Sequence, residues 1–120
     1  MKYMIMMFGD QQSMMEMRTP EWIREMIKFM HQLNDDLIKS GEYVLAEGLA
    51  DASQAKTVDF KNGMPVVTDG PFAESKESLA GFWVVDVENE TRALDIARHV
   101  VAFTQGPIEV RQFGEAPPEV

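Results

Sequence analysis

The sequence predicts a single-domain α+β fold, and three observations support this prediction. The 120-residue chain contains no long linker rich in Pro, Gly or Ser, so we expect one domain over residues 1–114 and a tail at 115–120. Two stretches have the apolar spacing of amphipathic helices, and short β-favouring runs surround them. Asn62-Gly63 separates two of these runs, which is the strongest short-range signal of a β-hairpin.

The first half of the chain is predicted to form a strand, a helix and a strand. Residues 2–8 are apolar on both alternating sets of side chains, as in a strand covered on both faces. Residues 19–21, Thr-Pro-Glu, supply the N-cap, the first-position proline and the first-turn acid of a helix. We expect this helix to run to Ser40 and to end at Gly41, with a second strand over 42–49.

The second half is predicted to contain a hairpin, a strand, a helix and a strand. The hairpin spans 55–61 and 64–68, and the long strand at 79–87 is again apolar on both sets. A helix is expected over 90–103 and a closing strand over 108–113. Without the hairpin, the order is the β-α-β-β-α-β arrangement of ferredoxin-like folds.

In that arrangement both helices cover one face of the antiparallel sheet. The strands at 2–8 and 79–87 are also apolar on the face that no helix is left to cover. A large exposed apolar surface on a soluble protein marks an interface. We therefore expect a homodimer that closes sheet against sheet.

Composition excludes several classes of function. The chain has no cysteine, so disulfides, thiolate catalysis and Cys-based zinc sites are ruled out. The net charge is −9, from 20 acidic and 11 basic residues, so we expect no direct binding of nucleic acid. The chain lacks both a long apolar run and a signal-peptide pattern, so we expect a cytoplasmic protein without a membrane segment.

The ten methionines are a high number for this length. Two Met-x-Met pairs, at 4–6 and 15–17, have soft thioethers that can hold Cu(I). We prefer the interpretation that these flexible side chains fill gaps in an apolar core. We therefore predict neither a metal site nor a cofactor.

Residues 68–77 read T-D-G-P-F-A-E-S-K-E and predict a rigid corner. Gly70 and Pro71 favour a sharp turn, and Asp69 can accept hydrogen bonds from nearby backbone amides. Phe72 is a large apolar anchor beside that acid, and we predict that it binds substrate. The alternative is that the whole stretch only shapes a turn.

The block D-G-P-F-A-E-S-K-E, followed by L-A-G-F-W-V-V-D-V, resembles the signature of the DGPF-domain branch of the YCII-related (YciI-like) family. The similarity extends to K-Y-M at the start of the chain, A-E-G-L at 46–49 and E-V-R at 109–111. The resemblance implies a ferredoxin-like fold of the dimeric α/β-barrel type. It implies no particular substrate, because the family is largely uncharacterised.

His31 is the strongest candidate for acid–base chemistry. It lies at the edge of the apolar stripe of the first helix, where a histidine either bonds locally or reaches a cleft. The resemblance implies a catalytic histidine on this helix ahead of a strand that ends in a Gly-containing turn, and His31 precedes Gly48 by 17 positions. His99 falls off the apolar side of the second helix, and we expect it to be solvated without a role.

The acid that would pair with His31 is less well defined. The family often has an Asp-Pro near the end of its second helix, but residues 100–106 read V-V-A-F-T-Q-G and contain no acid. Asp69 is therefore our first candidate and Glu47 the next. Arg111 is predicted to hold a substrate carboxylate, and an ion pair with Glu109 is the alternative.

Two functions follow from these residues. The first is a small cofactor-independent enzyme in which His31 and its acid perform lyase, isomerase or dehydrohalogenase chemistry on a small organic molecule. The second is a non-catalytic binding or regulatory module. The resemblance links it to sigma-factor-dependent transcription, because DGPF relatives are fused to or encoded near sigma-factor-like proteins. The acidic surface implies that this link would use protein contacts.

Overall fold

The computed structural model describes residues 1–9, 15–71 and 78–115. Its elements are β1 (Lys2–Phe8), α2 (Pro20–Ser40), β2 (Tyr43–Gly48), η1 (Ala52–Gln54), β3 (Lys56–Lys61), β4 (Met64–Asp69), β5 (Leu79–Asp86), α3 (Glu90–Thr104) and β6 (Ile108–Gln112). Four strands form an antiparallel sheet in the order β2-β5-β1-β6, and β3 pairs with β4 in a separate sheet. The α+β class and the order of elements predicted from the sequence are confirmed.

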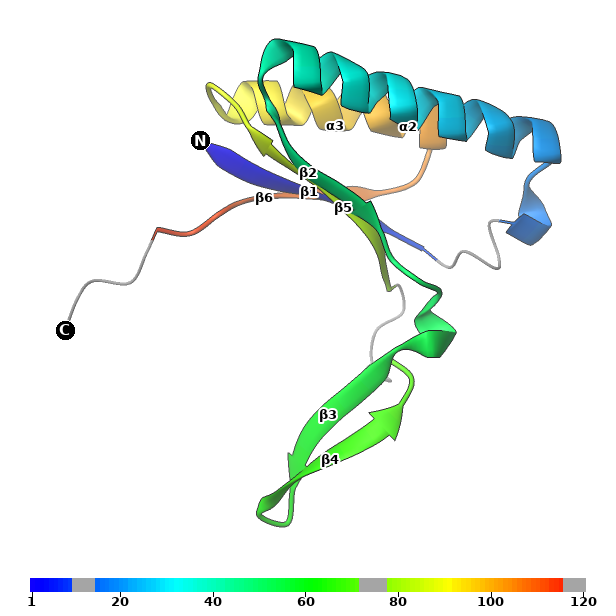
Figure 1. The fold of residues 1–120 in the computed structure, drawn as a ribbon, viewed down its shortest axis with the longest axis vertical. Helices are drawn as coiled ribbons and strands as arrows, with labels where there is room; N and C mark the ends of the chain where they lie inside the picture. The colour runs from blue at the N-terminus through cyan, green and yellow to red at the C-terminus, as the bar shows by residue number, and fades with distance from the viewer. Residues whose placement is uncertain (10–14, 72–77, 116–120) are drawn as a thin grey trace.

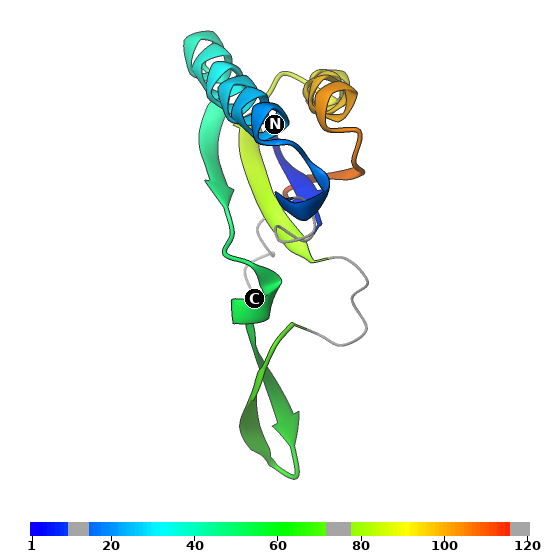
Figure 2. The same ribbon diagram turned by 90° about the vertical axis from the view of Figure 1, so that its right-hand side faces the viewer.

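Both long helices lie side by side on one face of the four-stranded sheet (Figures 1 and 2). The core fills the space between helices and sheet. Its buried members are Tyr3, Ile5, Leu33, Leu37, Trp83, Val85, Val87, Ala93, Ile96, Ala97 and Val100. None of the described helices is both long enough and apolar enough to cross a membrane.

The two ends of α2 are fixed by the caps that the sequence predicts. The Thr19 hydroxyl accepts a hydrogen bond from the Trp22 amide at 3.1 Å. Gly41 takes the left-handed conformation, with φ +78°, and donates to the Ile38 carbonyl at 3.1 Å. The helix is therefore 21 residues long, as expected from residues 19–41.

Only the C-terminal half of α2 packs fully onto the sheet. Leu33 and Leu37 are its buried residues, whereas Trp22, Met26 and Met30 are half-buried. The inward side chains of the N-terminal half therefore keep part of their surface free, and an open space remains between them and the sheet.

One edge of the predicted apolar stripe of α2 faces solvent. Ile27 is 46% exposed and Ile38 is 58% exposed, although helical spacing places both with the inward residues. The stripe is wider than the part of the helix that the sheet covers, so its outer edge remains uncovered. His31, which lies between these two isoleucines on the helix surface, is exposed as well.

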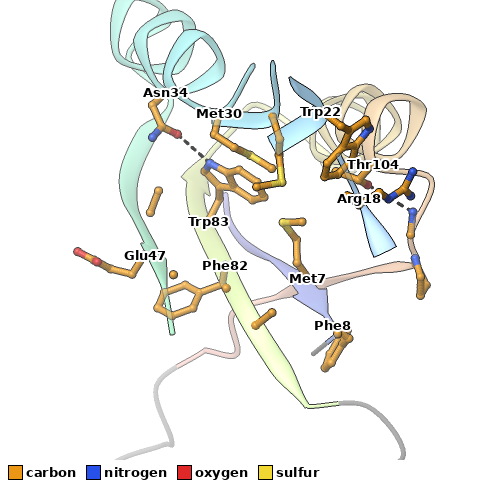
Figure 3. Close-up of a pocket in the computed structure, with 18 of the residues that line it drawn as sticks. Met7, Phe8, Arg18, Trp22, Met30, Asn34, Glu47, Phe82, Trp83 and Thr104 are labelled. Atoms are coloured by element: carbon orange, nitrogen blue, oxygen red, sulfur yellow. Dashed lines mark hydrogen bonds between the residues drawn. The ribbon is translucent and has the colours of Figure 1, made fainter. Parts of the chain in front are cut away.

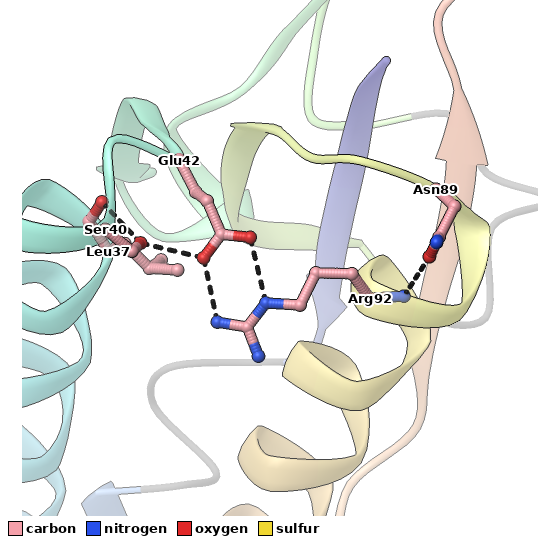
Figure 4. A network of polar contacts seen from close by, with 5 residues as sticks. All are labelled: Leu37, Ser40, Glu42, Asn89 and Arg92. Atoms are coloured by element: carbon pink, nitrogen blue, oxygen red, sulfur yellow. Dashed lines mark hydrogen bonds and ion pairs between the residues drawn. The ribbon is translucent and has the colours of Figure 1, made fainter.

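A bidentate ion pair joins the start of β2 to the start of α3 (Figure 4). Arg92 donates from Nε and from one terminal nitrogen to the two carboxylate oxygens of Glu42, each at 2.8 Å. Ser40 Oγ donates to the same carboxylate at 2.7 Å, and Asn89 caps α3 by accepting from the Arg92 amide at 3.0 Å. The pair therefore holds the end of α2 and the beginning of α3 at a fixed distance.

The hydrogen bonds from Arg92 lower the pKa of the Glu42 carboxyl below its ordinary value, against the opposing effect of burial. The same hydrogen bonds raise the pKa of Arg92. In the unfolded chain Glu42 takes up a proton near its ordinary pKa of about 4.3. The stabilisation is therefore complete above that pH and is lost as the pH falls through the lowered pKa of the folded state.

We expect Glu42→Gln to lower the free energy of unfolding at pH 7 by about 1–2 kcal/mol, because a charge-assisted bidentate contact is lost in a partly buried place. The difference from wild type should shrink below about pH 4, where protonation removes the same charge. Urea unfolding of both proteins at pH 7 and below about pH 4 measures this difference. Glu21→Gln is the control, because the Glu21–Arg24 pair is exposed and 3.5 Å long, and its loss should cost about 0.5 kcal/mol or less. A cost for Glu42→Gln that does not change with pH would contradict this account.

Candidate functional site

A cleft of about 740 Å³ lies between the N-terminal half of α2 and the sheet (Figure 3). Its walls come from α2, from β1, β2 and β5, and from the segment that follows α3. The lining is largely apolar and includes Met7, Phe8, Met17, Trp22, Met26, Met30, Ala46, Ala80, Phe82, Trp83 and Pro107. Both tryptophans of the chain line this cleft.

The roof of the cleft is one row of side chains on α2. Trp22, Met26, Met30 and Asn34 follow one another at intervals of four residues, which places them on the same face of a helix. Asn34 lies twelve residues after Trp22, a span of about 18 Å at the rise of an α-helix. The cleft is therefore an elongated trough that runs along the helix axis.

Part of the floor of the cleft has no side chains because two glycines pair there across the sheet. Gly48 of β2 pairs with Gly81 of β5, and the next pair on the same face is Ala46 with Trp83. A β-carbon at Gly81 would lie 3.0 Å from the Glu47 carbonyl oxygen, so the close approach of the two strands requires glycine there. Across β2 and β5 the floor therefore presents little side-chain volume at this pair, and Met7 of β1 lies beside it.

A hydrogen bond closes the inner end of the trough. Trp83 donates from Nε1 to Oδ1 of Asn34 at 2.8 Å (Figure 3). The indole N–H is only a donor, so it fixes the oxygen of the amide towards Trp83 and leaves the NH₂ group of Asn34 to donate elsewhere. This end of the cleft is therefore closed by two side chains of fixed orientation, and the Asn34 nitrogen lies on the side away from Trp83 (Figure 3).

A stack of rings and a guanidinium group closes the other end. The Arg18 guanidinium lies 4.4 Å from the centre of the Trp22 ring. Trp22 stacks on Phe103 at 5.6 Å, Phe103 on Phe29 at 4.7 Å, and Phe29 contacts His99 at 4.9 Å. The stack fastens the N-terminal half of α2 to α3. His99 is exposed as expected, but its ring packs against Phe29.

Thr104 lies at the same end of the cleft as Arg18 and is buried. Its hydroxyl oxygen accepts a hydrogen bond from the Gly106 amide at 3.4 Å. The hydroxyl proton can therefore be donated to a group in the cleft.

The structure places His31 and Asp69 away from this cleft. His31 is exposed on α2, and it does not line the cleft. The side chain of Asp69 is 88% exposed and forms an ion pair with Lys56. No hydrogen bond or ion pair between the described residues joins His31 to Asp69. Their pairing in a catalytic site stays a prediction.

The other predicted site residues are also distributed around the molecule. Glu47 is one of the residues that line the cleft, and it pairs with Phe82 of β5; its carboxylate points away from Met7 and Met30 (Figure 3). Arg111 forms a 2.7 Å ion pair with Glu109 on β6, the alternative that the sequence left open. Phe72 lies outside the described residues.

The corner at Asp69 has the backbone geometry that the sequence predicts. Gly70 has φ +96°, in the left-handed region that favours glycine. Its amide donates to the Ala55 carbonyl at 2.7 Å, and its carbonyl accepts from the Thr57 hydroxyl at 2.7 Å. The corner is therefore fastened to the start of β3.

The cleft residues escaped the sequence analysis for a clear reason. Trp22, Met26 and Met30 have the spacing of core residues, and spacing alone does not separate a packed core from the roof of a cleft. The available signal was Asn34, a polar residue at the next position of the same row. A half-buried polar side chain in an apolar row indicates a specific partner, which here is Trp83.

Comparison with known proteins identifies the relatives of this chain. Residues 1–115 match the YCII-related domain. The chain belongs to the YCII-related family. It is also 29% identical to an uncharacterised protein of Rhizobium meliloti, over 98% of this chain and 99% of that protein. Membership of the family named by the resemblance is thus confirmed, and the assignment to the DGPF branch stays a prediction.

In this YCII-related protein we expect the two floor glycines to respond differently to substitution. Gly81→Ala should destabilise by about 1–3 kcal/mol, because its β-carbon meets the backbone of Glu47. Gly48→Ala should be neutral or stabilise by about 0.5 kcal/mol, since a β-carbon there meets nothing within 4 Å and the unfolded chain loses freedom. Urea unfolding measures both. Equal effects of the two substitutions would show that the strands do not approach closely at Gly81.

Proposed function

We propose that this YCII-related protein binds a small organic molecule with an apolar body in the cleft under α2. The observation that carries the proposal is the cleft itself. Its volume of about 740 Å³ lies within the range of small-molecule sites. Its lining combines apolar and aromatic side chains with a few polar groups, which is the composition of such sites.

The four methionines of the lining support the binding of apolar bodies of more than one shape. Met7, Met17, Met26 and Met30 are unbranched, flexible and polarisable. Such side chains repack around different partners at little cost. We therefore propose a site that selects its ligand through its polar ends and tolerates variation in the apolar middle.

Binding is favoured over the acid–base enzyme by where the titratable side chains lie. General acid–base catalysis needs a proton-transfer group within hydrogen-bond reach of the substrate. His31 is exposed outside the cleft. Glu47 lines the cleft, but its carboxylate points away from Met7 and Met30 in the middle of the lining. Lyase, isomerase or dehydrohalogenase chemistry by His31 with Asp69 stays a prediction, and so does a link to a sigma factor.

We also propose that the protein forms a homodimer through the open face of a ferredoxin-like sheet. The strand order β2-β5-β1-β6 and the two helices on one face support this arrangement (Figure 2). On the other face, Met6 and Val84 are buried among their neighbours and Met4 is half-buried. Phe82, which pairs with Met6 and also borders the cleft, is half-buried as well. A second copy packed against this face would remove the exposed apolar surface from water.

Filling the cleft tests the binding proposal. The ideal β-carbon of Gly48 meets nothing within 4 Å, and Gly48 lines the cleft, so Gly48→Leu places a side chain in the trough without strain. We expect it to weaken the binding of anilinonaphthalene sulfonate, measured by quenching of tryptophan fluorescence, by about 10- to 100-fold.

Gly114→Leu is the matched control, because its β-carbon also has open space and Gly114 does not line the cleft. The control should bind like wild type, and both variants should keep the wild-type circular dichroism spectrum. Unchanged binding in a folded Gly48→Leu variant would contradict the proposal.

Light scattering coupled to size exclusion tests the dimer. The wild type should have twice the chain mass of 13.6 kDa. Met4→Glu should shift the protein to the monomer, because two carboxylates would meet in the interface. Within one chain the new carboxylate lies opposite Arg111, so the fold should be preserved. Val67→Glu on the exposed hairpin is the control and should stay dimeric. A monomeric wild type would overturn this part of the proposal.

A further inference from the structure

Three of the polar residues that line the trough lie at its two ends, and the carboxylate of the fourth, Glu47, points away from Met7 and Met30. Arg18 and Thr104 stand beside Trp22, and Asn34 stands beside Trp83 (Figure 3). Between them the roof consists of Met26 and Met30, and the floor consists of glycine, alanine and Met7. A ligand that fills the trough therefore needs a polar group at the Arg18 end and an apolar body along the middle.

The distance between the ends limits the length of that ligand. Trp22 and Asn34 are about 18 Å apart along the axis of α2. A molecule of a few atoms occupies one end only. A ligand that contacts both tryptophans at once is therefore elongated.

The charge at the outer end selects the chemistry of the ligand. Arg18 is the only cationic side chain among the described residues that line the cleft. One face of its guanidinium is covered by the Trp22 ring, and this stacking leaves the in-plane N–H groups free to donate. Those groups match the geometry of a carboxylate, and the described residues give Arg18 no carboxylate partner of their own.

The donors around this end support the same selection. The Thr104 hydroxyl proton is a second donor beside Arg18. At the far end the Asn34 amide oxygen is already used by the Trp83 N–H, so the donors for an anion lie at the Arg18 end. The net charge of −9 gives anions no general attraction to this protein, so an acidic ligand depends on Arg18 in particular.

We propose, building on the binding function proposed above, that the ligand is an elongated amphiphilic acid. Its carboxylate pairs with Arg18 at the Trp22 end. Its apolar body lies along the methionines of α2 over the Gly48–Gly81 floor. Its far end reaches Trp83.

Three probes and the two tryptophans test this assignment. Dodecanoate, dodecanol and hexanoate are titrated into the full chain, and the Trp83→Phe and Trp22→Phe variants report on the Trp22 end and the Trp83 end separately. We expect dodecanoate to change the fluorescence of both tryptophans with one affinity. Hexanoate should change that of Trp22 only, because it is too short to reach from Arg18 to Trp83.

Arg18→Gln isolates the acidic group. It should weaken the binding of dodecanoate by about tenfold or more, because a charge-assisted hydrogen bond is lost. The affinity for dodecanol should not change. Arg24→Gln is the matched control, since Arg24 pairs with Glu21 on the outer surface of α2 and does not line the cleft. It should bind dodecanoate like wild type.

Two results separate this proposal from the one on which it rests. Equal affinities for dodecanoate and dodecanol, both unaffected by Arg18→Gln, would overturn the acidic ligand and leave the binding function standing. Failure of dodecanol, dodecanoate and anilinonaphthalene sulfonate alike to change either tryptophan would overturn both.

Discussion

The unequal packing of α2 on the sheet is the constraint on which the site depends. Under its C-terminal half the sheet carries large side chains, and Leu33 and Leu37 are buried against them. Under its N-terminal half the paired residues Gly48 and Gly81 have no side chains to fill the space between the helix and the sheet. One straight helix therefore contributes to a packed core at one end and roofs an open trough at the other, and Trp83 marks the boundary.

The trough is held open because α2 is fastened at both ends. At the C-terminal end the core and the Glu42–Arg92 pair hold the helix against α3. At the N-terminal end the stack of Trp22 on Phe103 makes a second attachment. A helix held at both ends cannot collapse onto the floor, so the cleft is formed before any ligand enters. Preformed sites of this kind bind without the cost of ordering the protein.

Sequence reasoning recovered the elements of the fold because their signals are local. The Thr19 cap, the Gly41 terminus and the Asn62-Gly63 turn each act within a few residues, and each is present in the structure. The cleft depends instead on which residues meet across strands. Nothing local indicates that Gly48 lies opposite Gly81, a pairing that becomes visible only when β2 and β5 are in register.

The placement of His31 shows the same limit on a helix. The helical spacing of about 100° per residue puts His31 at the margin of the apolar stripe. The spacing does not show how much of that stripe the sheet covers. In the structure Ile27 and Ile38 face solvent on that side, and His31 lies with them. Trp22, Met26 and Met30, which do face the cleft, lie within the stripe, and of the roof residues only Asn34 differed from ordinary core composition.

The central claim is that the trough under the N-terminal half of α2 receives the ligand, and NMR spectroscopy of the two indole N–H groups during a titration with dodecanoate tests it most directly. The account predicts that the signals of Trp22 and Trp83 shift together and saturate at one ligand concentration, while the amides of β3 and β4 keep their positions. Shifts confined to the hairpin or to the open face of the sheet, with both indole signals unmoved, would contradict it.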